Sequence, residues 1–249
     1  MIKSIAKALD ILELFSVNET RSLGLAEIAS RMDMNKSTCA NILKTLREKG
    51  YVEQAEYRSD YQIGYKLYQL GMRDIENSKL TDMARYDIDL LGMSLNETAI
   101  FSVIRNDRRV VLYGNVPDHE MVVRTNIDKS VYATCTGRAI LANYAPEHLD
   151  KFIVRVGMPS PEDWPEIYQN ENHRGELINA LVSIKGQGYA VGHEGNGIAG
   201  FAAPVFKNDQ VVGAVGISVP EERLVDENSV LEKVLDCAEK ISGNLDLKL

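Results

Sequence analysis

Apolar residues recur at the i, i+3, i+4, i+7 spacing of an amphipathic helix in three successive stripes at the start of the chain. The stripes comprise Ile5, Ala8, Leu9, Leu12 and Phe15; then Leu25, Ile28, Ala29 and Met32; and then Cys39, Ile42, Leu43 and Leu46. Gly24 stands at the N-cap position of the second helix, and Gly50 can end the third because glycine adopts the left-handed conformation. Only residues 33–35 separate the second and third helices, which predicts a helix-turn-helix.

The periodicity changes after Gly50 to short extended runs. YVEQ and DYQIG flank the polar segment AEYRS, which predicts a β-hairpin. Three helices and a hairpin together predict a winged helix-turn-helix domain over residues 1–63. Helical spacing returns over residues 66–92 and moves to another face beyond Asn77 and Ser78. We therefore expect a linker helix over residues 64–79, followed by the first helix of a second domain.

Strands and helices mix in the rest of the chain. RNDR separates the extended runs ETAIFSVI and RRVVLYGNV, EMVVRT is a third run, and KNDQ separates IAGFAAPVF from VVGAVGIS. Both polar separators predict hairpin turns. Helical patterns cover roughly residues 134–155, 172–186 and 226–246. This mixture predicts an α+β domain over residues 80–249, with one face of its sheet open to a ligand.

The net charge of -8 is divided unequally along the 249 residues. Residues 1–63 hold 9 of the 28 basic and 9 of the 36 acidic residues, so the remaining 186 residues carry the whole excess. The acidic second part excludes general polyanion binding there. The neutral first part, with locally clustered basic residues, is still able to bind phosphate.

The distribution of cysteine, histidine and apolar residues indicates a cytoplasmic protein. No apolar run reaches the roughly 20 residues that span a bilayer, and the first 15 residues lack the unbroken apolar segment of a signal peptide. Cys39, Cys135 and Cys237 are odd in number and far apart, which fits reduced thiols. The four histidines are dispersed, so we expect neither a metal site nor a cofactor, and no catalytic motif appears.

The exposed face of the third helix predicts a DNA-binding surface. Burial of its apolar stripe turns small and donor-rich side chains outward, namely Lys36, Ser37, Thr38, Ala40, Asn41, Lys44 and Arg47. Asn41 can pair bidentately with adenine beside Ala40, whereas Ser37, Thr38 and Lys44 suit phosphate. Arg58, in the hairpin tip, is placed for the minor groove or a flanking phosphate. The alternative for the helix face is a solvated surface, and the same holds for Arg58.

Several segments together resemble the IclR (isocitrate lyase regulator) family of bacterial transcription factors. SIAKALDILELF, LGLAEIASRMDMNKSTCANILKTLREKGYV and YQIGYKLYQLG resemble its DNA-binding domain and linker, while ATCTGRAILA, GQGYAV and IAGFAAPVFKNDQVVGAVGISVPEERL resemble its effector domain. The resemblance covers almost the whole chain. It implies a GAF-like effector-binding domain that takes a small metabolite, often a carboxylic or aromatic acid, and a homodimer or a dimer of dimers. We expect operator binding, with repression favoured over activation.

The resemblance also implies the residues of an effector pocket. In family members, small residues at the start of a helix line the pocket, and the matching residues here are Cys135, Thr136 and Gly137. Residues of the last hairpin also line it, and the matching residues are Gly200, Gly216 and Ser218. Exposed N–H groups at this helix start can donate hydrogen bonds to a carboxylate, and the hydroxyls of Thr136 and Ser218 are further donors.

One loop departs from the family pattern. Many relatives have an acidic run and a longer loop where this chain has GHEGNGIAGF, with Gly200 at the usual cysteine position and Gly216 at a frequent serine position. His193 and Glu194 are the polar residues left there for effector contact, and the alternative for His193 is a solvent-facing histidine. The extra glycines enlarge the pocket or remove polar contacts from it, or else the pocket has lost its ligand.

Cys135 also raises the alternative of an enzyme. A thiol at a helix N-terminus can act as a nucleophile, and GAF-like domains include redox enzymes that reduce methionine sulfoxide. Such an enzyme, acting on a small thiol or sulfoxide, needs a resolving cysteine. Only Cys237 remains in this domain, and its position beside Val234 and Ile241 indicates a core residue. A transcriptional regulator is therefore the favoured class.

Overall fold

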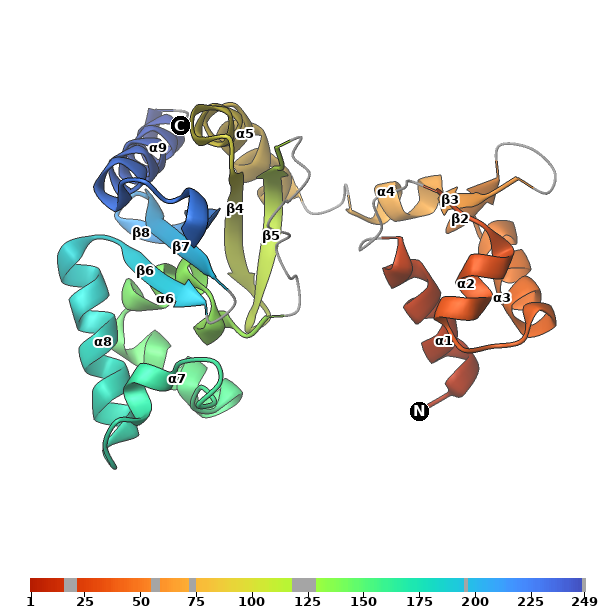
Figure 1. Cartoon of the computed structure of the whole chain (residues 1–249), viewed down its shortest axis with the longest axis horizontal. Coiled ribbons are helices and arrows are strands. Elements are labelled where there is room, and N and C mark those ends of the chain that lie inside the picture. Colours follow the sequence, from red (N-terminus) through yellow and green to blue (C-terminus); the bar gives the residue numbers. More distant parts are fainter. Residues whose placement is uncertain (16–21, 55–58, 72–74, 118–128, 195–196, 248–249) are drawn as a thin grey trace. The chain divides into compact units, whose positions relative to one another are not determined.

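The computed structural model describes residues 1–15, 22–54, 59–71, 75–117, 129–194 and 197–247. The chain forms two compact units, Met1–Ile75 and Glu76–Leu249 (Figure 1). The division falls within the segment 64–79 that the sequence assigns to a linker. None of the helices in the described ranges is long and apolar enough to cross a membrane.

The N-terminal unit is a winged helix-turn-helix, as predicted. Its elements are α1 (Lys3–Leu14), β1 (Ser22–Leu23), α2 (Leu25–Arg31), α3 (Lys36–Glu48), β2 (Val52–Gln54), β3 (Tyr61–Ile63) and α4 (Tyr65–Gly71). The strands pair antiparallel in the order β1-β3-β2. The two-residue strand β1 was not predicted, because two residues are too short to show an alternating pattern.

Local side chains fix the ends of α3. Asn35 is the N-cap, and its Oδ1 accepts a hydrogen bond from the backbone N of Thr38 at 2.8 Å. Gly50 follows the helix with φ of 79°, the left-handed conformation expected from the sequence. Gly64 lies so close to Gly50 that a Cβ on it would come within 2.3 Å of the Gly50 carbonyl oxygen. These constraints join the end of α3 to the start of α4.

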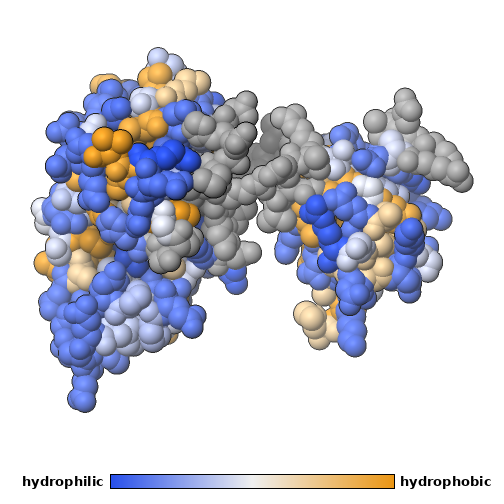
Figure 2. Space-filling view, in the orientation of Figure 1, coloured by the Kyte–Doolittle hydropathy of each residue, from blue (hydrophilic) through white to orange (hydrophobic). Residues whose placement is uncertain are grey.

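The predicted buried stripe of α1 is partly wrong. Ile11 and Phe15 are buried, whereas Ile5 and Leu9 are 55% and 53% exposed. Helix α1 turns the Ile11 side toward the core that α2 and α3 share. The spacing alone did not decide between the two faces because both carry apolar residues. Figure 2 shows hydrophobic surface on this unit, at the right of the view, among hydrophilic side chains.

The C-terminal unit is an α+β domain built on a five-stranded antiparallel sheet. Its order is β5-β4-β8-β7-β6. The strands are β4 (Thr98–Arg105), β5 (Arg108–Asn115), β6 (Ala190–Glu194), β7 (Ile198–Lys207) and β8 (Gln210–Pro220). The helices are α5 (Ile75–Leu95), α6 (Cys135–Ala142), α7 (Pro146–Val156), α8 (His173–Gln187) and α9 (Glu227–Leu247), with 3₁₀ turns η1 (Val131–Ala133), η2 (Pro165–Tyr168) and η3 (Glu221–Arg223).

Alternate residues of the strands face two separate cores. Phe201 and Ala203 of β7 belong to a core with α5 and α9, whereas Ala202 between them belongs to a core with α6, α7 and α8. This follows from the two-residue period of a strand. The sheet is therefore covered by helices on both faces, as Figure 1 shows, and the expectation that one face is open to a ligand is wrong.

Both predicted hairpin turns are present. Asn106 and Asp107 have φ of 50° and 62°, and Asn208 and Asp209 have φ of 48° and 59°. Asn and Asp tolerate this left-handed conformation, so an Asn-Asp pair is a turn signal.

Two boundary predictions need correction, and one strand prediction is not tested. The pattern over 134–155 is two helices, α6 and α7, because Pro146 starts a new helix at its first position. Asn77 and Ser78 lie inside α5 and do not interrupt it. The predicted strand EMVVRT falls outside the described residues.

Candidate functional site

The first candidate site is the outer face of α3. Lys36, Ser37, Asn41, Lys44 and Arg47 are exposed, and Thr38 and Ala40 are half-buried. Cys39, Leu43 and Leu46 are buried on the opposite side, as predicted, whereas Ile42, predicted to be buried with them, is half-buried. Ser37 Oγ donates to Asn35 Oδ1 at 2.9 Å, so the capping residue also orients a hydroxyl at the helix start. Arg58 lies outside the described residues.

Two basic residues of this face differ in their surroundings. Lys44 lies 4.0 Å from Glu48, and both side chains are well exposed. Arg47 Nη1 donates to Gln54 Oε1 at 2.6 Å, and Gln54 Nε2 donates to the Ser59 carbonyl at 2.6 Å. Arg47 is thus tied to the base of the wing, whereas Lys44 extends from the middle of the helix toward solvent.

An apolar groove lies beside this face. Ile5, Leu9 and Leu12 of α1 line it together with Ile42 of α3 and Tyr51, and its volume is about 820 Å³. The polar side chains of Thr38, Asn41 and Thr45 border the same groove. The exposed half of the α1 stripe is therefore continuous with the predicted DNA-binding helix.

The second candidate site is the start of α6. Thr134 caps the helix, with its Oγ1 3.2 Å from the Gly137 backbone N. The backbone approaches Val131 so closely here that a Cβ on Gly137 would lie 2.0 Å from the Val131 carbonyl oxygen. Thr136 is 4% exposed, and its Oγ1 has no hydrogen-bond partner among the described residues. The helix start is therefore packed against the sheet.

Gly200 and Gly216, two positions at which the chain differs from the family pattern, leave room for side chains of α6. A Cβ on Gly216 would lie 2.5 Å from Thr136 Cγ2, and one on Gly200 would lie 3.1 Å from Cys135 Sγ. Cys135 Sγ already lies 3.3 Å from the Gly200 carbonyl oxygen. The space left by these glycines is filled by Cys135 and Thr136, so the expectation that the glycines enlarge the pocket is wrong.

A cavity of about 420 Å³ lies beside Cys135. Its lining consists of Lys129, Ala133, Cys135, Arg138, Glu162, Asp163, Pro165, Glu166, Gly192 and His193. Cys135 and His193 were predicted from the sequence. Thr136, Gly137, Gly200, Gly216 and Ser218 are not part of this lining. Ser218 is half-buried in β8, opposite Gly200 of β7, and Glu194 ends β6.

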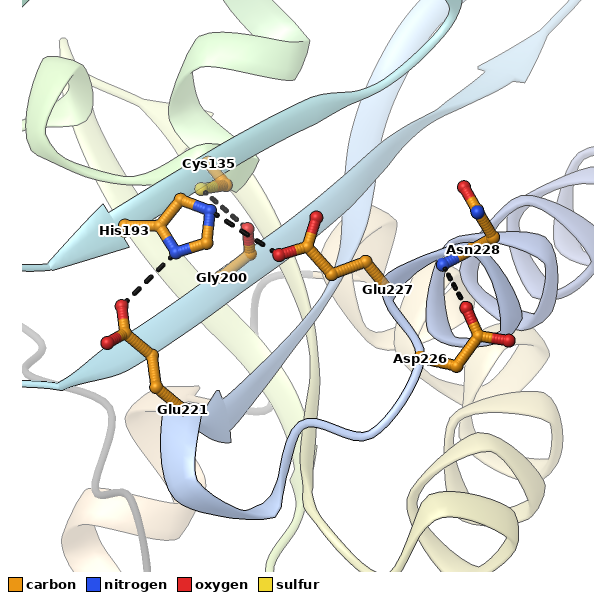
Figure 3. A network of polar contacts seen from close by, with 7 residues as sticks. All are labelled: Cys135, His193, Gly200, Glu221, Asp226, Glu227 and Asn228. Atoms are coloured by element: carbon orange, nitrogen blue, oxygen red, sulfur yellow. Dashed lines mark hydrogen bonds and ion pairs between the residues drawn. The ribbon is translucent and has the colours of Figure 1, made fainter.

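His193 is part of the cavity lining and faces two carboxylates (Figure 3). Its Nδ1 is 3.1 Å from Glu221 Oε1, and its Nε2 is 3.7 Å from Glu227 Oε1. These residues come from β6, η3 and the start of α9. His193 therefore bridges β6 to η3 and to the start of α9, and its side chain is half-exposed.

Arg138 is the main feature that sequence reasoning missed. It is 8% exposed, its Nε donates to the Tyr132 carbonyl at 2.6 Å, and its Nη2 donates to the Asp163 carbonyl at 2.9 Å. The guanidinium carbon also lies 4.1 Å from the centre of the Trp164 ring. A lone arginine directly before the apolar run AILA was the available signal, because charged residues are rarely buried without partners.

The described thiols do not form a redox pair. Cys237 packs in the core that includes Phe201, whereas Cys135 packs against the core on the other face of the sheet. Burial raises the pKa of the Cys39 thiol and raises that of Cys237 to about 12. No group of three or more His, Cys, Asp or Glu side chains within the described ranges is arranged to hold a metal ion.

Comparison with known proteins identifies both units. Residues 4–56 match the IclR helix-turn-helix domain, and residues 72–243 match the bacterial transcriptional regulator IclR C-terminal domain. The chain belongs to the IclR family. IclR proteins are DNA-binding transcriptional regulators with an effector-binding domain and not enzymes, so the redox alternative is set aside.

Similar IclR proteins are matched along nearly their whole length. The glycerol operon regulatory protein of Streptomyces coelicolor is 28% identical, with 98% of this chain and 96% of that protein covered. The HTH-type transcriptional regulator KdgR of Escherichia coli is 26% identical, with 98% and 93% covered.

Solved structures show the same fold. The Thermotoga maritima IclR is 25% identical with a TM-score of 0.66, and 98% and 99% of the two chains are covered. An IclR homologue from Microbacterium hydrocarbonoxydans, complexed with 4-hydroxybenzoate, is 20% identical with a TM-score of 0.70, and 97% and 98% are covered.

Proposed function

We propose that this IclR protein represses transcription from a palindromic operator and is controlled by a small carboxylate-bearing effector. The observation that carries the DNA-binding part is the outer face of α3, where a capped helix start, Asn41 and Lys44 are presented together on the exposed side. Ser37, Thr38 and Lys44 contact phosphates, and Asn41 with Ala40 reads bases.

The protein acts as a homodimer in this proposal, with pairing of dimers left to measurement. Ile5 and Leu9 are more than half exposed and border a groove with Leu12, Ile42 and Tyr51. Apolar surface of this kind supports pairing with a second copy, because a two-fold dimer matches the symmetry of a palindrome. The effector binds more tightly to one of two arrangements of the DNA-binding units and so shifts the protein toward that arrangement. The linker over residues 64–79 transmits this change from the effector domain to the DNA-binding unit.

Operator binding is tested with labelled promoter fragments at several salt concentrations. We expect a preference over random DNA at every salt concentration, and binding without any preference would overturn the proposal. Asn41→Ala should relax sequence preference, whereas Lys44→Ala should weaken binding to all sequences and reduce the salt slope by about 1. Lys185→Ala, an exposed lysine of the C-terminal unit, is the matched control and should change neither.

A further inference from the structure

We propose that the effector is a small zwitterion, with one carboxylate and one ammonium group, held in the cavity outside Cys135. This inference rests on the proposed function, since it concerns the effector of the same regulator. The free space around α6 decides where an effector can bind. The sheet side of α6 is closed by the contacts of Cys135 with Gly192 and Gly200 and of Thr136 with Gly216. The cavity of about 420 Å³ is lined by Cys135 and Arg138 of α6 and by Gly192 and His193 of β6, and its volume falls within the range of small-molecule sites.

Charges of both signs line this cavity. Lys129 and Arg138 provide two positive charges, and Glu162, Asp163 and Glu166 provide three negative ones. Asp163 belongs to a local turn, because its backbone N donates to Ser160 Oγ at 3.1 Å and its Oδ2 lies 3.4 Å from the Ser160 backbone N. Glu162 and Glu166 are exposed. They form the acidic wall that a ligand meets.

Arg138 fixes the acidic wall to α6. Its buried guanidinium donates to the Tyr132 carbonyl before α6 and to the Asp163 carbonyl between Glu162 and Glu166, and it stacks on Trp164. A buried charge held by two carbonyls and a ring is costly to displace. The acidic wall is therefore preorganised relative to the helix start, which lowers the free-energy cost of binding a ligand between them.

Groups of both charges in the cavity lining favour complementary groups on a ligand. Lys129 and the N-terminal end of α6 attract a carboxylate, since a helix N-terminus carries partial positive charge. Glu162 and Glu166 attract an ammonium group. A simple monocarboxylate would gain the first interaction but would leave the lining carboxylates, which outnumber the two cations, without a positive ligand group. A zwitterion offers a partner to groups of both signs, so amino-acid-like compounds fit better than the corresponding acids or amines.

Thermal shift and calorimetric titration of the full-length protein test this with matched probes. The zwitterions are β-alanine, 4-aminobutyrate, L-norvaline and 4-(aminomethyl)benzoate. Their counterparts without the amine are propionate, butyrate, pentanoate and 4-methylbenzoate, and those without the carboxylate are ethylamine, propylamine, butylamine and benzylamine. At least one zwitterion should bind about tenfold or more tightly than both of its counterparts. Tighter binding of the monocarboxylates, or binding of no zwitterion in the panel, would overturn the inference.

Charge-neutral variants locate the binding. Glu162→Gln and Glu166→Gln should each weaken zwitterion binding by about tenfold and leave the unfolding temperature of the unliganded protein unchanged, because both side chains are exposed. Glu147→Gln, at an exposed glutamate of α7 outside the cavity lining, is the control. Unchanged zwitterion binding in both cavity variants would contradict the assigned site.

Operator binding separates the two proposals. If a monocarboxylate releases promoter DNA while no zwitterion binds, the ligand class is wrong and the regulatory function stands. If the protein has no preference for promoter DNA, the regulatory function fails whatever the cavity binds.

Discussion

Thr136 and Gly216 are fitted to each other across the boundary between α6 and the sheet. The γ-methyl of Thr136 lies where a Cβ on Gly216 would come within 2.5 Å of it. Thr136 is buried, and Gly216 pairs with both Ile100 of β4 and Ala202 of β7 in the middle of the sheet. Neither side chain nor backbone can move away without disturbing the core.

Gly216→Ala should therefore destabilise the C-terminal unit by about 1–3 kcal/mol, the usual cost of overpacking a core. Urea unfolding measures the change. Thr136→Ser removes the clashing methyl, so the double variant should regain most of the stability. Gly243→Ala is the control, because a Cβ there meets nothing within 4 Å in α9, and it should be neutral or stabilising. A double variant as unstable as Gly216→Ala alone would show that the methyl is not the cause.

Gln54 links the DNA-binding helix to the wing. It accepts a hydrogen bond from Arg47 and donates one to the Ser59 carbonyl, both at 2.6 Å. Gln54→Ala removes both bonds, and we expect operator affinity to fall about fivefold, equivalent to the loss of about 1 kcal/mol. Fluorescence anisotropy with promoter DNA measures this loss. Gln62→Ala is the control, since Gln62 donates to Glu53 within the sheet and does not reach α3. Equal losses in the two variants would show a general effect on the sheet.

The pH dependence of stability should reveal the contact between Asp107 and Arg155. The two Arg155 nitrogens donate to the carboxylate at 2.7 and 2.8 Å, and this hydrogen bonding lowers the pKa of Asp107. The ionised Asp107 carboxylate therefore stabilises the folded state at pH values above its unfolded-state pKa of about 3.9. This contribution is lost as the pH falls through the lower pKa of the folded state.

Asp107→Asn isolates this charge, because asparagine also tolerates the left-handed conformation of the turn. Its thermal unfolding temperature should lie slightly below that of the parent at pH 7, and the two should converge in acid. The effect is small because Arg155 is 53% exposed and water screens the pair. Asp209→Asn makes the same change in the other hairpin and serves as the control. A difference that grows as pH falls would contradict the assigned cause.

Thiol labelling should distinguish the three cysteines. Burial raises the pKa of Cys39 and raises that of Cys237 to about 12, so little thiolate is present at either near pH 8. Cys135 is half-buried and lines the cavity. In the native protein one thiol should react rapidly, and Cys135→Ser should abolish that phase. The other two should react only after unfolding, and rapid labelling of native Cys135→Ser would contradict this ordering.

Local signals in the sequence were sufficient for much of the fold. Cys39, Leu43 and Leu46 of the predicted stripe are buried, Ile42 is half-buried, and Gly50 ends α3 in the left-handed conformation. The Asn-Asp turns at residues 106–107 and 208–209 have the predicted geometry. These features depend on contacts within a few residues, so the chain specifies them without knowledge of its distant neighbours.

The remaining features depended on what the elements pack against. Ile5 and Ile11 are both apolar residues of α1, yet only Ile11 is buried, because burial depends on which side of α1 meets the core. Glu162 and Glu166 line the same cavity as Cys135 and Arg138, and Arg138 ties their segment to α6 through the Asp163 carbonyl.

The sequence by itself therefore determined the two domain types, the outer face of α3 and the hairpin turns, because each is written in local spacing and turn chemistry. Only the tertiary structure decided that Cys135 and Thr136 fill the space beside Gly200 and Gly216. It also decided that a cavity lined by groups of both charges lies beside Cys135. Close packing between segments far apart in the chain sets the shape of that cavity, and no local pattern records it.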